Sequence, residues 1–355
     1  MYYLDPKIKE LHRIFDQNER KDFLRLDLNE NPGGLPQYFI NQVLADITPQ
    51  FISQYPETSQ FAETLAKYLN TDTANLCLVN GSAEGIRYII QAFTSPNGKI
   101  VGVVPSYFMF QVYSEMYGRN FVKIPYDRDL SMNVDNIIKE ITPDTQLLIL
   151  LNPNNPMGNT YSDDEFERIM EAVKTNQVTV LIDEAYHYFY PHTFMDYALK
   201  NDHVFVTRTF SKLFSMAACR LGYVAGWREG IKMIQKMCTP HNTNAFALKF
   251  AEEVLKRPDL IELLISNFKG GRDWLMSTLD SNGYEHKGEA GNFIFIKTKT
   301  DAEIIVRRMK EEKKILIKSY PDVGNFGTCL RVTIGEKKYM QRFWDALVEL
   351  DKYRE

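Results

Sequence analysis

Four polar side chains in this sequence have the chemical types that carbonyl chemistry on a bound aldehyde requires. Lys212 ends the run Thr-Phe-Ser-Lys, and its amine could form a Schiff base with an aldehyde. Asp183 follows the apolar run 178–182, where its carboxylate could keep a ring nitrogen protonated. Asn155 could hydrogen-bond a phenolic oxygen, and the planar guanidinium of Arg220 suits a phosphate. Together these residue types indicate a site for pyridoxal phosphate.

A cradle for the phosphate is predicted where a strand gives way to a helix. The segment Gly-Ser-Ala-Glu at 81–84 follows a probable strand at 76–79 and opens a run with apolar residues at helical spacing. The free N–H groups and the positive dipole end of a helix favour an anion. We therefore expect the backbone of Gly81, Ser82 and Ala83 to bind the phosphate.

Three more side chains complete the expected cofactor site. Ser211 directly precedes Lys212 and could join Arg220 at the phosphate. Tyr186 lies just past the strand that carries the aspartate, within reach of the phenolic oxygen of the cofactor. Tyr107, in the run Pro-Ser-Tyr-Phe, is a candidate for stacking on the ring face.

Taken singly, these residues have simpler interpretations. Lys212 lies beside two phenylalanines and could be a surface lysine that covers apolar neighbours. Asp183 and Asn155 could stabilise turns, and Tyr107 could belong to the core. The segment 81–84 could be an ordinary helix start. The combination of all these features in one chain favours the cofactor site.

Segments along most of the chain resemble fold-type I aminotransferases, which use pyridoxal phosphate, and most closely the histidinol-phosphate aminotransferase branch. The resemblance covers about residue 25 to residue 350. The matching segments are 26–32, 54–57, 80–85, 152–156, 183–186, 209–212 and 330–335. Within this family, Lys212, Asp183 and Tyr186 correspond to the catalytic positions, and the other residues named above correspond to cofactor contacts.

The resemblance also implies roles that spacing alone does not indicate. Tyr55 would reach the phosphate of a neighbouring subunit's cofactor, so a homodimer is expected. Arg331 would clamp a substrate carboxylate, although an arginine on a solvated strand face is the simpler interpretation of its alternating context. Lys318 stands where the family usually has an arginine that grips the substrate phosphate. Asn29, in the segment 26–32, is a third candidate for substrate binding.

The predicted activity is a ping-pong transamination between an amino acid donor, expected to be glutamate, and a small phosphorylated carbonyl compound. Lys212 would act as the general base that moves a proton on the substrate. Because Lys318 replaces the usual arginine, histidinol phosphate itself is less strongly indicated as the substrate. A decarboxylase of a phosphorylated amino acid, similar to threonine-phosphate decarboxylase, is the alternative. A regulatory protein with an aminotransferase-like domain is a third reading, but it would need an added DNA-binding region before residue 26.

Composition agrees with an enzyme of small molecules. The chain has 355 residues, of which 44% are hydrophobic and 25% charged, and its net charge is −4. Without a long basic run, nucleic acid is not an expected partner, and no run approaches the ~20 apolar residues of a membrane span. The four cysteines are far apart in sequence, with neither metal-site spacing nor a disulfide framework. We expect a cytoplasmic enzyme of amino-acid biosynthesis without a metal.

Short apolar runs alternate with helical patterns over the first two thirds of the chain, which is typical of a mostly parallel sheet covered on both faces. The runs are 76–80, 100–104, 147–152, 178–183, 203–208 and 221–226. After about residue 240 the pattern changes to long helices, for example 260–279, then strands and a last helix. Those strands are expected at 292–296, 315–317 and 329–334, and the helix at 336–350.

The predicted fold class is therefore α/β, the fold-type I arrangement of pyridoxal-phosphate enzymes. A large domain holds a mostly parallel seven-stranded sheet between helices, and a smaller C-terminal domain is α+β. We assign residues 1–44 to an N-terminal arm and part of the small domain, 45–244 to the large cofactor-binding domain, and 245–355 to the small domain. The cofactor is expected between the two domains.

Overall fold

The computed structural model describes residues 2, 4–11, 20–288 and 290–352, and its centre is a seven-stranded sheet. The strands lie in the order β2-β8-β7-β6-β5-β3-β4. Their bounds are β2 Leu76–Val79, β3 Lys99–Val104, β4 Asn120–Pro125, β5 Thr145–Leu151, β6 Thr179–Asp183, β7 Val204–Thr209 and β8 Gly222–Gly226. Strand β8 runs in the opposite direction to the other six strands of this sheet, which is therefore mostly parallel as predicted.

Helices cover both faces of this sheet, which explains why the central strands are continuous apolar runs. Alternate residues of each strand point to opposite faces. On one face the core includes residues of α5 (Ser82–Phe93), α6 (Met109–Met116) and α10 (Arg228–Gln235). On the other it includes residues of α7 (Val134–Glu140), α8 (Asp163–Asn176) and α9 (Met195–Lys200). Leu147 of β5 packs in the first core and Leu148 in the second.

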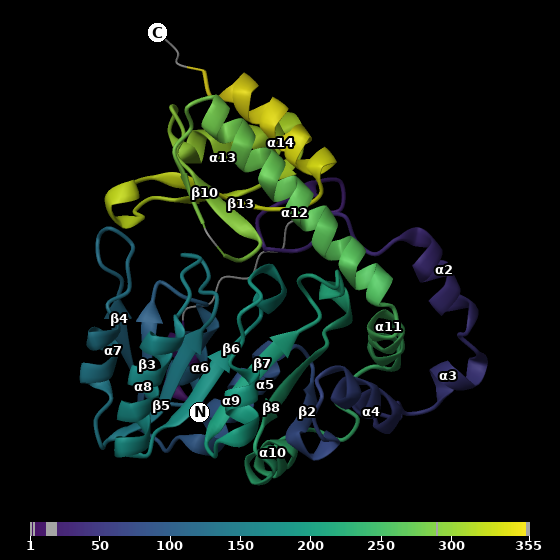
Figure 1. Cartoon of the computed structure of the whole chain (residues 1–355), viewed down its shortest axis with the longest axis vertical. Helices are drawn as coiled ribbons and strands as arrows, with labels where there is room; N and C mark the ends of the chain where they lie inside the picture. Colours follow the sequence, from purple (N-terminus) through teal and green to yellow (C-terminus); the bar gives the residue numbers. More distant parts are fainter. Residues whose placement is uncertain (1, 3, 12–19, 289, 353–355) are drawn as a thin grey trace.

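A second, smaller sheet lies beyond the carboxyl ends of the large one (Figure 1). Its strands are antiparallel, in the order β12-β13-β10-β9. They span β9 His286–Lys287, β10 Phe293–Ile296, β12 Lys318–Tyr320 and β13 Cys329–Thr333. This sheet shares a core with α13 (Ala302–Lys313), α14 (Lys337–Leu350) and the later turns of α12 (Pro258–Ser281).

The N-terminal part of the chain joins this second unit through a short parallel pair. Strand β1 (Leu24–Arg25) pairs with β11 (Ile315–Leu316), and the chain then passes between the two sheets at residues 26–32. The remaining helices are α1 Pro6–Glu10, α2 Gln37–Ala45, α3 Pro49–Ser53, α4 Ser59–Tyr68 and α11 Ala245–Leu255. Single helical turns occur at Thr73–Asn75, His187–Phe189, Ala217–Cys219 and Gly324–Phe326.

The long α12 connects the two parts of the molecule. In Figure 1 it runs from the small sheet down to α11. Leu260 and Leu264 near its start pack in the same core as α11 and the large sheet, whereas Leu275 and Leu279 pack in the core of the small sheet. The domain limits at 44 and 244 stay predictions. Among the described residues, no helix is long and apolar enough to cross a membrane.

All six apolar runs predicted as strands of the large sheet do form strands, and the predicted helix 260–279 lies within α12. The seventh strand, β4, was not among these runs. It is an edge strand whose residues are mostly exposed or half-buried, so its sequence, Asn-Phe-Val-Lys-Ile-Pro, lacks a continuous apolar run. The predicted strand 315–317 is shorter than expected and pairs with β1.

Candidate active site

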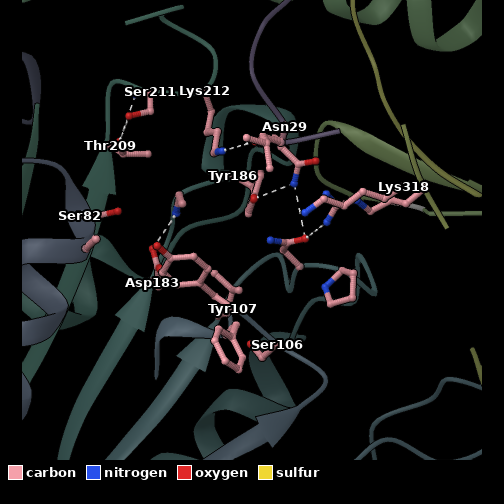
Figure 2. A pocket seen from close by; sticks show the side chains of 18 of the residues that line it. Asn29, Ser82, Ser106, Tyr107, Asp183, Tyr186, Thr209, Ser211, Lys212 and Lys318 are labelled. Carbon is pink, nitrogen blue, oxygen red and sulfur yellow. Dashed lines mark hydrogen bonds between the residues drawn. The ribbon is translucent and has the colours of Figure 1, made fainter. Parts of the chain in front are cut away.

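A cavity of about 340 Å³ lies where the carboxyl ends of β5, β6 and β7 face the small sheet. All predicted site residues except Gly81 and Tyr55 line it, and Figure 2 shows many of these side chains. They are Asn29, Ser82, Ala83, Tyr107, Asn155, Asp183, Tyr186, Ser211, Lys212, Arg220, Lys318 and Arg331. Residues separated by up to three hundred positions are thus brought together, because parallel strands deliver their loops to one edge.

Asp183 is the last residue of β6 and is almost completely buried at the floor of the cavity. The N–H of Ala185 donates to its Oδ1 at 3.1 Å. Burial raises the pKa of this carboxyl to about 7, and the Ala185 hydrogen bond opposes the rise. A cation placed against the carboxylate, such as a protonated ring nitrogen, would favour its ionised form.

Lys212 reaches into the cavity from the loop after β7 and donates from Nζ to the carbonyl oxygen of Leu28 at 3.0 Å. Its Nζ lies 5.7 Å from the ring centroid of Tyr186. Burial lowers the pKa of Lys212 to about 8, the positive charge of Arg331 adds to this effect, and Glu30 opposes it. The amine is therefore neutral in a larger fraction of molecules than an ordinary lysine would be near neutral pH.

Asn29 organises the upper side of the cavity. Its Nδ2 donates to the hydroxyl of Tyr186 at 2.9 Å and lies 3.5 Å from Oδ1 of Asn155. The hydroxyl of Thr333, on β13, lies 3.1 Å from the N–H of Asn29 and 3.3 Å from its Oδ1. Asn29 adopts a left-handed conformation with φ 57°, which asparagine tolerates better than most residues. Burial raises the pKa of Tyr186 to about 12, so its hydroxyl stays protonated.

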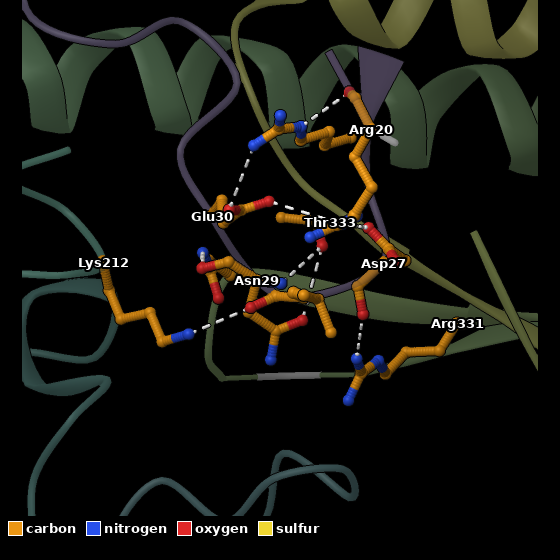
Figure 3. Close-up of polar contacts among 10 residues, drawn as sticks. Arg20, Asp27, Asn29, Glu30, Lys212, Arg331 and Thr333 are labelled. Atoms are coloured by element: carbon orange, nitrogen blue, oxygen red, sulfur yellow. Dashed lines mark hydrogen bonds and ion pairs between the residues drawn. The ribbon is translucent and has the colours of Figure 1, made fainter. Parts of the chain in front are cut away.

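Arg331 lies on β13 with only 4% of its surface exposed. Its two terminal nitrogens donate to Oδ1 of Asn155 at 2.7 Å and to the carbonyl oxygen of Asp27 at 2.6 Å. The carboxylate of Asp27 in turn pairs with Arg20 (Figure 3). The predicted alternative of a solvated arginine is wrong, because the small sheet turns this side chain toward the large one. Lys318 lies opposite Arg331 in the register of β12 and β13.

Backbone and side chains converge where the phosphate cradle is predicted. Helix α5 begins at Ser82, and the first N–H groups of a helix have no partner within it. A Cβ at Gly81 would lie 2.4 Å from Nη2 of Arg220, so the guanidinium rests against the glycine backbone. Nη1 of Arg220 donates to Oγ of Ser211 at 3.2 Å. This end of the cavity fits a phosphate, and the amine and buried carboxylate described above fit the aldehyde and ring nitrogen of pyridoxal phosphate.

Tyr55, like Gly81, is a predicted cofactor residue that does not line this cavity. It lies on the surface with 78% of its area exposed, and its ring stacks on that of His241 with centroids 4.4 Å apart. Its expected role concerns the cofactor of a second subunit, so the position within one chain does not test it.

Several lining residues were not predicted. Ser106, Phe108, Thr209 and Tyr320 line the cavity. Tyr320 could have been found from its spacing, because it lies two residues after Lys318 on the same strand and therefore on the same face. The carbonyl oxygens of Asp27 and Leu28, which accept from the arginine and the lysine, have no signature in residue type.

Fold and site together define a pyridoxal-phosphate enzyme, and comparison with known proteins gives the family. The family described as "Aminotransferase class I and II" matches residues 21–347. The chain belongs to this family, whose members use pyridoxal phosphate, and it has the fold-type I arrangement predicted from the sequence.

Named relatives are histidinol-phosphate aminotransferases. The enzyme of Clostridium novyi is 29% identical over 330 residues, covering 92% of this chain and 91% of the relative. Among solved structures, the histidinol-phosphate aminotransferase of Sinorhizobium meliloti in complex with pyridoxal-5'-phosphate has a TM-score of 0.87 at 20% identity, covering 99% and 98% of the two chains. That of Clostridium acetobutylicum has a TM-score of 0.81 at 25% identity, covering 92% and 99%. The chain is thus an aminotransferase related to this branch.

Replacing Gly81 by alanine should weaken cofactor binding. The new Cβ would displace the guanidinium of Arg220, and the positive φ of 79° adds strain. We expect the dissociation constant of pyridoxal phosphate, measured by absorbance titration, to rise about tenfold or more, equivalent to about 1.4 kcal/mol. Gly283→Ala is the control, because Gly283 also has a positive φ but open space around it. Equal affinity in the Gly81 variant and the wild type would contradict the cradle.

The cofactor-free protein should have one lysine that reacts at unusually low pH. Because burial and Arg331 disfavour the ammonium form, the amine of Lys212 should be half-deprotonated at about pH 8 rather than at its ordinary 10.5. Competitive acylation across a pH series, followed by peptide mass spectrometry, measures this midpoint. Arg331→Gln should move it upward. A midpoint near 10.5 for Lys212 in the wild-type protein would show that burial and Arg331 do not lower its pKa.

Proposed function

We propose that this aminotransferase moves an amino group between an amino acid donor, glutamate, and a small phosphorylated carbonyl compound, such as the ketone that corresponds to histidinol phosphate. The observation that carries the proposal is the pair of cations, Arg331 and Lys318, on adjacent strands of the small sheet in the cavity that contains Lys212. Two cations there suit substrates with a carboxylate or a phosphate beside the reacting amine or carbonyl group.

Residues around the large sheet would hold the cofactor. Ser82, Ala83, Ser211 and Arg220 would bind the phosphate, with Gly81 giving the backbone room to approach. When bound, pyridoxal phosphate supplies an electron sink that makes a proton on the neighbouring substrate carbon acidic.

On the ring, each contact would have a separate purpose. The carboxylate of Asp183 would hold a proton on the ring nitrogen, and Tyr107 would stack on the ring face. Tyr186 and Asn155 would hydrogen-bond the phenolic oxygen. The hydroxyl of Tyr186 also accepts from Asn29, so its own proton remains available for that contact.

Lys212 would move the proton on the substrate. A base is most effective when its pKa lies near the working pH, and the value of about 8 satisfies this condition. The amine is held by the carbonyl oxygen of Leu28 at 3.0 Å, a neutral acceptor that leaves its lone pair free when the amine is unprotonated. The backbone of Leu28 would therefore orient the base without neutralising it.

Arg331 would bind the carboxylate of the amino acid donor. The two hydrogen bonds that orient its guanidinium go to the amide oxygen of Asn155 and the backbone carbonyl oxygen of Asp27. Both oxygens are neutral, so these bonds leave the positive charge uncompensated. The same guanidinium lies 5.6 Å from the ring centroid of Phe293 and 5.5 Å from that of Tyr320. These rings and bonds fix its plane, as bidentate binding of a carboxylate requires.

Lys318 would provide the contact for the substrate phosphate. It is a compact charge on a flexible stem, which tolerates phosphates at varied positions better than a planar arginine fork does. The names of the relatives, histidinol-phosphate aminotransferases, support a phosphorylated substrate class. We also infer a cytoplasmic homodimer that serves amino-acid biosynthesis, with Tyr55 reaching the partner's cofactor across the interface.

The role of Lys318 can be tested with histidinol phosphate and its dephosphorylated form. Lys318→Met should lower kcat/KM for the phosphorylated substrate about tenfold to a hundredfold, the cost of about 1.5–3 kcal/mol for a charged hydrogen bond. The unphosphorylated substrate should be affected little, and Lys318→Arg should retain most activity. Steady-state kinetics in the reverse direction, with 2-oxoglutarate accepting the amino group from either amine, give both values.

Two variants complete that experiment. Lys299→Met removes an exposed lysine of the same part of the chain, which lies over Tyr284, and should leave both substrates unaffected. Lys212→Ala should abolish turnover of every substrate. An equal loss for both substrates in Lys318→Met would contradict a phosphate contact, and wild-type turnover in Lys212→Ala would contradict the assigned base.

A further inference from the structure

Two cysteines that are far apart in sequence lie together beneath the phosphate cradle. The Sγ atoms of Cys77 and Cys238 are 3.6 Å apart across a separation of 161 residues. All four cysteines are free thiols in the structure. The sequence does not predict the contact of Cys77 with Cys238, because only the fold brings β2 next to the residues that follow α10.

The two thiols differ in position and access. Cys77 lies within β2 with 3% of its surface exposed, and the ladder pairs it with Val224 of β8. Cys238 lies in the turn after α10 and is only partly buried. Helix α10 is tied to the strand by Gln235, whose Nε2 donates to the carbonyl oxygen of Leu76 at 3.2 Å. One thiol is therefore fixed and shielded, and the other belongs to a partly exposed residue.

We propose that Cys77 and Cys238 form a redox-active dithiol, in which a peroxide oxidises Cys238 and Cys77 then closes an intramolecular disulfide. In the first step the Cys238 thiolate attacks one oxygen of the peroxide, the O–O bond breaks, and a sulfenic acid forms with release of hydroxide, or of an alkoxide from an organic peroxide. In the second step the Cys77 sulfur displaces the sulfenic hydroxyl. Together with the thiol proton this hydroxyl leaves as water, and the sulfur–sulfur bond forms.

The local electrostatics agree with this order of events. The contact with Cys77 lowers the pKa of Cys238, while burial and the negative charge of Glu84 oppose this. The same contact, together with burial, raises the pKa of Cys77. Because the thiolate is the nucleophile, the accessible cysteine is also the one that reacts with an oxidant.

A disulfide here would fasten the edge of the large sheet next to the cradle. A sulfur–sulfur bond is about 2.05 Å long, so the sulfurs must approach by about 1.5 Å. Nδ2 of Asn242 already donates to the carbonyl oxygen of Leu78 at 3.0 Å and lies 3.3 Å from Oε2 of Glu84. The same carboxylate oxygen accepts from the N–H of Asn80 at 2.7 Å, directly before the cradle. A covalent bond between the two segments would restrain their local opening.

The test is peptide mapping of the holoprotein after mild treatment with hydrogen peroxide. Remaining thiols are alkylated under denaturing conditions, and the digest is analysed with and without reduction. We expect one disulfide-linked pair of peptides carrying Cys77 and Cys238, with Cys219 and Cys329 still alkylated. Amide hydrogen exchange over residues 238–242 should be slower in the oxidised protein than in the reduced protein.

Single variants separate the two roles. In Cys238→Ser, peroxide should consume thiols at least about tenfold more slowly, because the accessible thiolate is gone. In Cys77→Ser, oxidation of Cys238 should stop at the sulfenic acid, which dimedone would then label. Cys219→Ser is the matched control, since Cys219 is also partly buried, and it should behave as the wild type.

Two results would overturn the proposal. One is a wild-type protein in which Cys77 and Cys238 stay reduced while Cys219 or Cys329 is oxidised. The other is a disulfide that links only separate chains. Both are read from the wild-type digest, so they remain decisive if a variant fails to fold. The readouts are peptide masses, and they do not depend on transaminase activity.

Discussion

The guanidinium of Arg331 is buried between the two sheets, and the arrangement of the site depends on the hydrogen bonds that it makes there. An unpaired buried charge is costly, so its partners are held firmly. One partner, Asn155, comes from the loop after β5 of the large sheet, and the other is the backbone of Asp27. The hydrogen bonds of one side chain therefore connect both sheets with the segment that passes between them.

That segment also sets the position of the reacting groups. Leu28 accepts from Lys212, Asn29 donates to Tyr186, and the carbonyl oxygen of Asp27 accepts from Arg331, so three consecutive residues contact three side chains of the site. Figure 3 shows the contacts that Lys212 and Arg331 make with this segment, with Arg20 and Glu30 above them in the view. A shift of the segment would alter all of these contacts together, which couples the geometry of the small sheet to that of Lys212.

Burial gives the cavity its reactivity by moving two pKa values in opposite directions. It raises that of Asp183 to about 7 and lowers that of Lys212 to about 8, so both groups titrate near neutral pH. Behind the site, Glu184 and Arg208 form a buried ion pair with Oε2 and Nη2 2.7 Å apart. The hydroxyl of Thr193 joins this pair, which anchors the residues next to Asp183.

Much of this arrangement could be predicted from the sequence, for identifiable reasons. Central strands such as β5 and β6 are buried on both faces, so they are continuous apolar runs whose ends place Asp183 and Asn155 at one edge. The edge strand β4 lacks such a run and was missed. The backbone acceptors of Arg331 and Lys212 have no residue-type signal, and the contact of Cys77 with Cys238 arises only from the tertiary structure.

The central claim is that Lys212 is the lysine that holds the cofactor. Borohydride treatment of the holoprotein fixes pyridoxal phosphate covalently to the lysine that binds it, and peptide mass spectrometry then identifies that lysine. The account predicts a single modified peptide that carries the cofactor on Lys212. Cofactor found on another lysine, such as Lys318 on the opposite side of the cavity, would contradict it.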